Sequence, residues 1–404
     1  MAVGLASPDA IAGSPPEGSR PQPDPGAVPL AVYVHVPFCL KKCPYCDFNS
    51  HTAKGALPEA KYLAALEREL DQWAPRTQGR RAVSVFFGGG TPSLMTPDFY
   101  HRILERLEAR IGLAGDCEIT LEANPGASEA ARFAGYRTAG VNRLSIGVQS
   151  LDDARLGDLG RIHSADDARA AVTAAREGGF ADLNLDLMFG LPGQAPAEAT
   201  DDLEALLALG PEHVALYQLT LEPGTVFAAQ PPQLPDPDAI ADTEEALRLR
   251  LAAAGFDHYE VSNHARPGRY CRHNRNYWEF GDYLGLGAGA HGKLTTPHGI
   301  LRTRNYAGPD AYMARAAEGA ATAEATFLDA DDAVGEFALN ALRLNHGAPV
   351  ALFRERTGLA SEHLTGPRQR AETMGLLDPH PEWMAPTQRG RAFLNDLVAL
   401  FLAG

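Results

Sequence analysis

Three of the chain's five cysteines stand in one short stretch, "PFCLKKCPYCDF", which begins at Pro37. Cys39, Cys43 and Cys46 have the spacing C-x3-C-x2-C, which lets one loop present three thiolates to a single small object. A [4Fe–4S] cluster needs four iron ligands, so a loop that supplies three leaves one iron open to a small molecule. The spacing therefore predicts an iron–sulfur cluster held by these three residues.

A structural zinc ion is the alternative occupant of this loop. Zinc would need a fourth ligand, and His35 or Asp47 could supply it. The remaining cysteines, Cys117 and Cys271, stand alone in the sequence. Isolated cysteines are usually small buried hydrophobic residues, so we expect neither of them to bind the metal.

A glycine run and several polar residues follow the expected strands, as the cysteines do. In parallel β/α folds the carboxyl ends of the strands carry the active site, because the loops there vary over a fixed scaffold. A Cβ at Gly89 or Gly90 would push the backbone away from a ligand, so the run is expected to contact one. The segments at this edge are "GGGTPS" (88–93), "EANPG" (122–126), "QS" (149–150) and "GLPG" (190–193), with Asp186 inside the fifth strand.

Strands and helices alternate from residue 30 to residue 254, which predicts a parallel sheet with right-handed crossovers. Six strand–helix units are too few for a closed eight-stranded barrel, so the fold class is α/β with a partial (β/α)6 barrel; a flat, doubly wound sheet is the alternative. The expected strands are 30–36, 83–87, 118–123, 143–148, 183–188 and 213–219. The expected helices are 58–73, 96–111, 128–139, 164–179, 196–208 and 236–254.

The composition divides the chain into three parts. Residues 1–28 are rich in Pro, Gly, Ala and Ser and predict a disordered tail. Residues 29–300 carry the barrel and its motifs. Residues 301–404 contain mainly short helices and one small hairpin near "PEWMAPTQRG", which predicts a C-terminal helical domain resembling a winged helix.

Charge and hydropathy exclude several classes of protein. The net charge is −15, from 51 acidic and 36 basic residues, which argues against a nucleic-acid-binding surface. No apolar run reaches the roughly 18 residues that span a bilayer, and the N-terminus lacks the pattern of a signal peptide. We therefore expect a cytoplasmic protein with no nucleic-acid partner, in a compartment where clustered cysteines bind metal rather than form disulfides.

The cysteine spacing, with the aromatic Tyr45 before the third cysteine, resembles the radical SAM superfamily. The resemblance implies a partial (β/α)6 barrel, a [4Fe–4S] cluster, and S-adenosylmethionine (SAM) chelated to the open iron. It also implies that an electron from the cluster cleaves a carbon–sulfur bond of SAM, while the protein positions and shields the cofactor.

Further motifs resemble the oxygen-independent coproporphyrinogen oxidase-like group over residues 30–390. They include "YVHVPFC", "LEANPG", "RLSIGVQS", "LGRIHS" and "NLDLMFGLPGQ". The resemblance implies a SAM site formed by Tyr33, Tyr45, Gly89, Gly90, Thr91, Glu122, Gln149, Arg161 and Asp186.

Two departures separate the chain from the oxidase itself. The oxidase has a further cysteine where this chain has Phe48, and it has an ordered N-terminal segment where this chain has a Pro-rich tail. Both departures resemble a sister family, the heme chaperone HemW family, as does the H-N-x-x-Y-W motif from His273 to Trp278.

The motif from His273 to Trp278 also contains a candidate heme ligand. An imidazole is a good iron ligand, so His273 is the candidate, with Cys271, His264 and His291 as alternatives. On physical grounds alone, His273 and Asn274 could equally bond to backbone at the end of the barrel.

The expected function is that of a heme chaperone that binds a [4Fe–4S] cluster, SAM and heme and hands heme to an acceptor protein. The alternative is an oxygen-independent coproporphyrinogen III oxidase that uses radical SAM chemistry on propionate side chains. An electron donor for the cluster is implied. Peripheral membrane contact, a homodimer and cleavage of SAM in the working cycle are left open.

Overall fold

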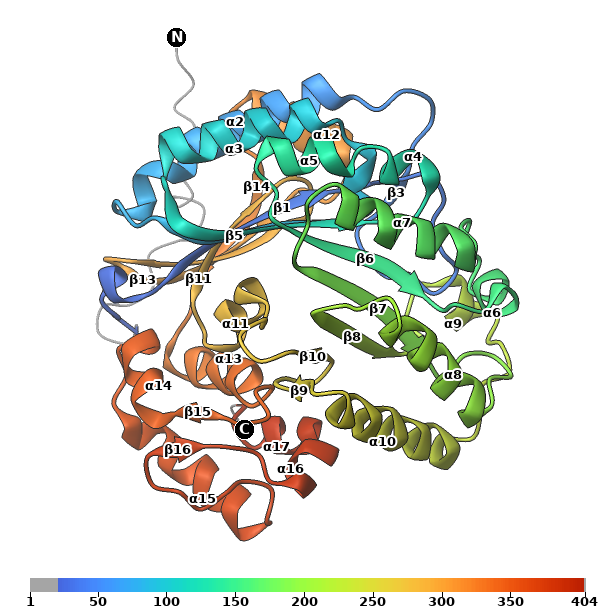
Figure 1. Ribbon diagram of the computed structural model, residues 1–404. Coiled ribbons are helices and arrows are strands. Elements are labelled where there is room, and N and C mark those ends of the chain that lie inside the picture. The colour runs from blue at the N-terminus through green and yellow to red at the C-terminus, as the bar shows by residue number, and fades with distance from the viewer. Residues whose placement is uncertain (1–20, 403–404) are drawn as a thin grey trace.

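The computed structural model describes residues 21–402, and its centre is one large sheet (Figure 1). The sheet has twelve strands in the order β14-β13-β12-β11-β1-β4-β5-β6-β7-β8-β10-β9. The six consecutive strands from β1 to β8 are parallel to one another, as the sequence predicts. They are β1 (Leu30–Val36), β4 (Ala82–Gly89), β5 (Leu113–Ala123), β6 (Arg143–Gln149), β7 (Leu183–Phe189) and β8 (His213–Gln218).

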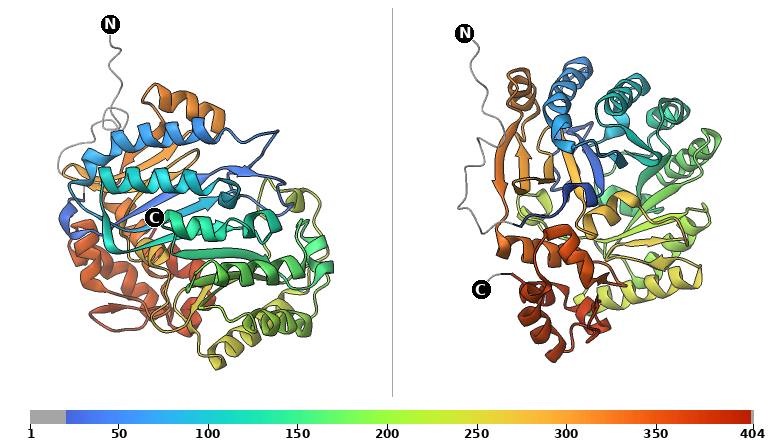
Figure 2. Two further views of the ribbon diagram at one scale, coloured as in Figure 1. Left: turned by 45° about the horizontal axis from the view of Figure 1, so that its top comes forward. Right: turned by 90° about the vertical axis from the view of Figure 1, so that its left-hand side faces the viewer.

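Helices cover the outer face of this curved sheet, and the right-hand view of Figure 2 shows strands inside and helices outside. Their apolar faces and the strands form one continuous core. Local signals mark the ends of these helices: the Thr96 side chain accepts a hydrogen bond from Phe99 N–H, Ser164 forms a capping box with Asp167, and Gly140 ends a helix in the left-handed conformation. The outer helices are α2 (Glu59–Trp73), α3 (Pro97–Arg110), α4 (Ala127–Ala130), α5 (Phe133–Ala139), α7 (Ala165–Glu177), α8 (Pro196–Leu207) and α10 (Pro237–Ala253).

The order of the strands shows that the sheet is a partial barrel. Its two end strands, β14 and β9, are not paired with each other. Because β1, β4, β5, β6, β7 and β8 run in one direction, their carboxyl ends meet along one edge. The fold class predicted from the sequence is confirmed.

Further strands extend the sheet on both sides, antiparallel except for β11, and none of them was expected from the sequence. β11 (Asp282–Leu286) is parallel to β1, and β12 (His291–Thr296), β13 (Gly299–Asn305) and β14 (Thr322–Phe327) follow it. The other end carries β10 (Asn263–Ala265) and β9 (Asp257–His258). α11 (Arg272–Trp278) and α12 (Pro309–Ala317) lie between these strands in the sequence.

The expected boundary at residue 300 therefore falls inside β13. The sheet continues to Phe327, and a second core begins with Leu328. Phe280 and Ile300 join this second core, so it is packed directly against the barrel.

The C-terminal part is mainly helical, as expected, and lies beneath the barrel in Figure 1. The segment expected to form a hairpin near Trp383 folds back on itself, with an antiparallel bridge between Leu377 and Pro386. In addition, β16 (Trp383–Met384) pairs with β15 (Ala348–Pro349). The helices are α13 (Ala330–Ala341), α14 (Val350–Thr357), α15 (Thr365–Thr373), α16 (Gln388–Ala392) and α17 (Leu394–Ala399), with the 3-10 helix η4 (Ser361–Leu364).

The expected N-terminal tail is described only from residue 21; residues 1–20 lie outside the described part. The segment 21–28 contacts the C-terminal part, where Arg356 Nη1 donates to the Ala27 carbonyl oxygen at 2.9 Å. Shorter elements are η1 (Pro25–Ala27), β2 (Phe38–Cys39), β3 (His51–Thr52), η2 (Ala74–Thr77), η3 (Pro92–Leu94), α6 (Asp153–Asp158) and α9 (Val226–Ala229). Within residues 21–402, no helix combines the length and apolar character needed to cross a membrane.

Candidate functional site

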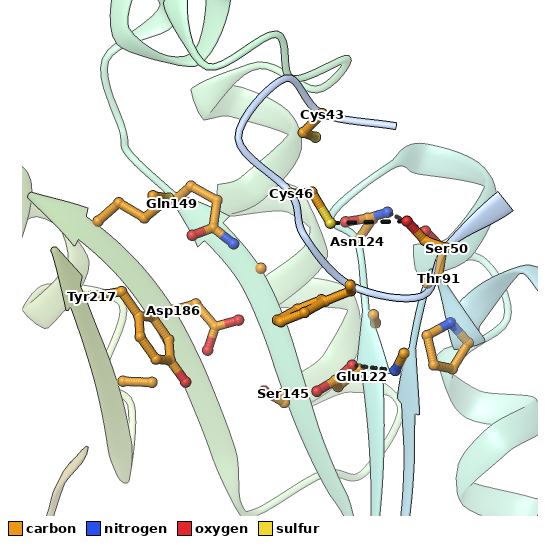
Figure 3. A pocket seen from close by; sticks show the side chains of 18 of the residues that line it. Cys43, Cys46, Ser50, Thr91, Glu122, Asn124, Ser145, Gln149, Asp186 and Tyr217 are labelled. Atoms are coloured by element: carbon orange, nitrogen blue, oxygen red, sulfur yellow. Dashed lines mark hydrogen bonds between the residues drawn. The ribbon is translucent and has the colours of Figure 1, made fainter. Parts of the chain in front are cut away.

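A cavity of about 550 Å³ opens at the carboxyl ends of the parallel strands and extends into the barrel (Figure 3). Its volume is within the usual range for small-molecule sites, roughly 300–1,000 Å³. Every residue assigned to the cluster or to SAM from the sequence lines it, and so does His273. They are Tyr33, Cys39, Cys43, Tyr45, Cys46, Gly89, Gly90, Thr91, Glu122, Gln149, Arg161, Asp186 and His273.

The cysteine loop spans the mouth of this cavity. β2 and β3 pair in parallel at the base of the loop, which brings its two ends together. The Tyr33 hydroxyl lies 2.9 Å from His35 Nδ1, and His35 Nε2 lies 2.8 Å from the Asn49 carbonyl oxygen. Because a carbonyl can only accept, Nε2 carries the proton and Nδ1 accepts from Tyr33. Burial lowers the pKa of His35, which favours this neutral form.

Polar groups surround the three thiols. Thr91 Oγ1 donates to Cys39 Sγ at 3.4 Å, and Arg161 Nη1 lies 3.7 Å from Cys43 Sγ. Ser50 Oγ lies 3.9 Å from Cys46 Sγ. Burial raises the pKa of the Cys39 thiol, so its thiolate needs a cation to stabilise it. The loop thus offers three sulfur ligands together with donors that suit a negatively charged sulfur site.

The zinc alternative finds little support among the described residues. His35 uses both ring nitrogens in hydrogen bonds, which leaves neither free as a metal ligand.

The groups closest to the glycine run are parts of the protein, whereas the sequence led us to expect a ligand there. A Cβ on Gly90 would lie 2.7 Å from the Phe38 carbonyl oxygen, and a Cβ on Gly89 would lie 2.6 Å from His35 Cε1. Gly89 also has a φ of 119°, which favours glycine. The run therefore lets β4 approach the base of the cysteine loop, in addition to lining the cavity.

Two carboxylates face the cavity from neighbouring parts of the sheet, Glu122 on β5 and Asp186 on β7 (Figure 3). Glu122 Oε2 accepts from Gly89 N–H at 3.1 Å, and Asp186 Oδ1 accepts from Asn184 Nδ2 at 2.7 Å. Burial, followed by the charge of Asp186, raises the pKa of Glu122 to about 8. Burial also raises the pKa of Asp186 to about 6. A cationic ligand beside these groups would favour their ionised forms.

Arg161 supplies a positive charge to the same cavity. Its Nη2 donates to Asn124 Oδ1 at 2.8 Å and to the Gly147 carbonyl oxygen at 3.0 Å. Asn124 also donates to Thr91 Oγ1 at 3.0 Å, and thus links Arg161 to the threonine beside Cys39. The sequence analysis quoted Asn124 within "EANPG" but gave it no role; only the fold brings it to Arg161. Gln149 adopts a left-handed φ of 68° at the end of β6.

His273 lies deeper in the barrel than a surface heme site requires. It is 1% exposed, and its ring stacks on Phe86 with centroids 4.8 Å apart. Nδ1 lies 3.3 Å from Ser84 Oγ, whereas Nε2 has no hydrogen-bond partner among the described residues. Burial lowers the pKa of His273 to about 3, so the ring is neutral. Of the alternative heme ligands, Cys271 lines the same cavity, but His264 and His291 do not.

These residues fit the chemistry of the cofactors that the sequence resemblance implies. SAM carries a sulfonium, an amino group and a carboxylate, so it needs both acidic and basic partners. The cavity provides Glu122 and Asp186 for positive groups and Arg161 for a carboxylate. The three loop thiols lie at the mouth of the same cavity.

Comparison with known proteins agrees with this architecture. The Radical SAM superfamily matches residues 33–206, and the HemN C-terminal domain matches residues 328–393. The heme chaperone HemW of Escherichia coli (strain K12) is 46% identical over 376 residues, which cover 93% of this chain and 98% of that protein. The chain belongs to the heme chaperone HemW family. The heme chaperone HemW of Mycobacterium tuberculosis (strain ATCC 25618 / H37Rv) is 39% identical over 391 residues, which cover 94% of this chain and 96% of that protein.

A solved structure extends the comparison to the fold. Coproporphyrinogen III oxidase (HemN) from Escherichia coli, a radical SAM enzyme, has a TM-score of 0.79 and 25% identity over 93% of this chain and 90% of that chain. The chain thus shares its barrel and C-terminal helical part with this oxidase.

Proposed function

We propose that the chain is a heme chaperone that holds a [4Fe–4S] cluster and SAM, binds heme, and transfers it to an acceptor protein. The observation that carries this proposal is the 46% identity to the heme chaperone HemW of Escherichia coli over 98% of its length. The cavity adds independent support, because the implied cluster and SAM residues all line it.

In this proposal Cys39, Cys43 and Cys46 hold the cluster at the mouth of the cavity. A cluster held there would supply an electron, and SAM beside it would supply a carbon–sulfur bond for reductive cleavage. Arg161 presents two N–H groups in a fixed fork to the SAM carboxylate. Glu122 and Asp186 accept hydrogen bonds from the positive and hydroxyl groups of SAM.

The remaining residues assigned to the SAM site shape the cavity and position the cysteine loop. Thr91 orients the Cys39 sulfur by its hydrogen bond, and Tyr33 fixes His35 against the loop. Gly89 and Gly90 bring β4 close to both loop and ligand. Tyr45 and Gln149 line the cavity near Cys46 and Asp186.

His273 stays a candidate iron ligand because its Nε2 lacks a partner among the described residues. His273 is buried, so a heme iron could reach it only through the cavity that SAM would occupy. Ligation by His273 therefore requires that heme enter this cavity.

A second candidate function is oxygen-independent oxidation of coproporphyrinogen III. The TM-score of 0.79 to coproporphyrinogen III oxidase favours it. Phe48 argues against the oxidase function, because the oxidase pattern has a cysteine at that position. The Phe48 side chain is exposed and lines the cavity.

The partners of the proposed chaperone are heme, a heme-acceptor protein and an electron donor for the cluster. A cytoplasmic setting belongs to the proposal, with a homodimer and peripheral membrane contact as its untested extensions.

The test uses the full chain with its cluster reconstituted under anaerobic conditions. Heme addition should give a saturable Soret band, and mixing with apomyoglobin should move that heme to the acceptor. In parallel, coproporphyrinogen III is incubated with the protein, SAM and a reductant, and no protoporphyrinogen should form. If coproporphyrinogen III is decarboxylated and heme shows no saturable binding, the oxidase function is correct and the chaperone function is wrong.

A further inference from the structure

Exposed apolar side chains surround the mouth of the cavity. Leu40 is 54% exposed, Phe48 is 61% exposed and Ile162 is 62% exposed, and all three line this one cavity. Leu40 and Phe48 lie on the cysteine loop, while Ile162 follows Arg161, whose Nη1 lies 3.7 Å from Cys43 Sγ. We call Leu40, Phe48 and Ile162 the rim. Large exposed apolar groups gathered at one opening mark a binding surface rather than ordinary surface composition.

Basic groups accompany the rim. Lys41 and Lys42 are exposed on the same loop and line the same cavity. Lys42 Nζ donates to the Phe48 carbonyl oxygen at 3.0 Å, and no carboxylate in the described part of the chain pairs with either lysine. The loop between Cys39 and Phe48 carries one acidic residue, Asp47, on a protein whose net charge is −15. The surface is therefore apolar and locally basic on an acidic protein.

This combination matches a flat, mostly hydrophobic ring that carries carboxylates at its edge. We propose that heme binds across the mouth, with its ring face on Leu40, Phe48 and Ile162 and its propionates toward Lys41 and Lys42. The inference rests on the proposed heme chaperone function and names the place of heme in it. The ring then needs no opening of the barrel, unlike iron ligation by His273, which is 1% exposed.

The position of the rim has a consequence for SAM. Heme on the mouth covers the opening that leads to Arg161, Glu122 and Asp186. Bound heme therefore slows the release of SAM from the cavity, and bound SAM is compatible with bound heme.

The first experiment compares heme with iron-free protoporphyrin IX on the cluster-reconstituted full chain. The rim recognises the ring and its carboxylates, so both porphyrins should bind with dissociation constants within about tenfold of each other. Ile162→Asp and Lys41→Glu should each weaken both porphyrins by about tenfold or more. Leu249→Asp, which changes an equally exposed leucine on α10, should leave both unchanged. Iron and sulfide content verifies that each variant keeps its cluster.

Two results would overturn the site. One is binding of heme but not of protoporphyrin IX, together with loss of heme binding in His273→Ala, which would assign recognition to the iron. The other is parental porphyrin binding by both rim variants. If the parent protein itself shows no saturable heme binding, the chaperone proposal fails first, and the site fails with it.

The second experiment follows release of radiolabelled SAM. Heme should slow this release severalfold in the parent protein and in Leu249→Asp, but not in Ile162→Asp. An unchanged rate in the parent at saturating heme would place heme away from the mouth and contradict the inference.

Discussion

Gly90 lies so close to Phe38 that a Cβ on the glycine would be 2.7 Å from the Phe38 carbonyl oxygen. The same carbonyl accepts a hydrogen bond from Thr91 N–H at 2.8 Å. Phe38 directly precedes Cys39, so the glycine run and the cysteine loop are packed backbone to backbone. A bulky substitution in one segment should therefore displace the backbone of the other.

We predict that Gly90→Val lowers cluster content and not SAM affinity alone. The valine side chain has to displace the backbone before Cys39, because a carbonyl at this distance cannot move aside as a flexible side chain can. Iron and sulfide analysis after anaerobic reconstitution measures the effect.

Gly115→Val is the matched control for this change. Gly115 lies in β5 with no atom within 4 Å of an added Cβ, so its variant should keep the cluster. If Gly90→Val keeps its full cluster content but binds SAM more weakly, Gly90 is needed for contact with SAM and not for the packing of the cysteine loop.

This contact shows where reasoning from sequence ends. The run "GGGTPS" predicts a close approach, since glycine allows it, but not which group approaches. The partner, Phe38, is brought there by the parallel pairing of β1 with β4, which places Val36 beside Gly89. The position of His273 is a similar case: its motif is visible in the sequence, but its stacking on Phe86 depends on where α11 enters the barrel.

The elements of the fold divide in the same way. The six parallel strands were predictable because long buried strands alternate with capped, amphipathic helices. Strands β9 to β14 were missed because they follow the last strand–helix unit and only α11 and α12 separate any of them from one another, so the alternation that identifies the first six strands does not extend to them. The expected boundary at residue 300 was therefore too early, as β13 and β14 still belong to the sheet.

The second prediction concerns the cysteines. Cys39→Ser, Cys43→Ser and Cys46→Ser should each lose most of the cluster, because each removes one of three protein ligands. Cys271→Ser is a demanding control, since Cys271 lines the same cavity but lies away from the loop. It should retain parental iron and sulfide, as should Cys117→Ser. If Cys271→Ser loses as much iron as the loop variants, Cys271 must be counted among the cluster ligands.

The third prediction concerns the geometry of Arg161. Arg161→Lys keeps the positive charge but loses the planar guanidinium, whose Nη2 donates to both Asn124 Oδ1 and the Gly147 carbonyl oxygen. SAM affinity should fall by about tenfold or more, while the cluster is retained. Calorimetric titration of SAM measures this change, and Arg169→Lys on the exposed face of α7 is the control. Parental affinity in Arg161→Lys would show that charge alone suffices.

The last prediction is a pH dependence of SAM binding that originates in Glu122. Burial, followed by the charge of Asp186, raises the pKa of this carboxyl to about 8, so the free protein holds a proton there at pH 7. The positive groups of SAM favour the ionised form and lower that pKa on binding. SAM binding therefore releases a proton, and SAM affinity should rise with pH from about 6 to 8 and then level off, by at most about tenfold per pH unit for one proton.

Glu122→Gln isolates this carboxyl. The amide keeps an oxygen that can accept from Gly89 N–H, as Glu122 does at 3.1 Å, but it cannot ionise. Its SAM affinity should be lower at pH 8 and nearly independent of pH across this window, apart from the contribution of Asp186, whose pKa is raised to about 6. Glu105→Gln, on the exposed side of α3, should keep the parental profile.

Titration of SAM in two buffers with different ionisation enthalpies counts the protons directly. The parent should release up to one proton per SAM near pH 7, and Glu122→Gln should release fewer. Proton uptake by the parent, or identical profiles for the parent and Glu122→Gln, would mean that Glu122 does not face the charged groups of SAM. The charge of the ligand would then have to be balanced by another carboxylate that lines this cavity, and Asp186 on β7 would be the first to test.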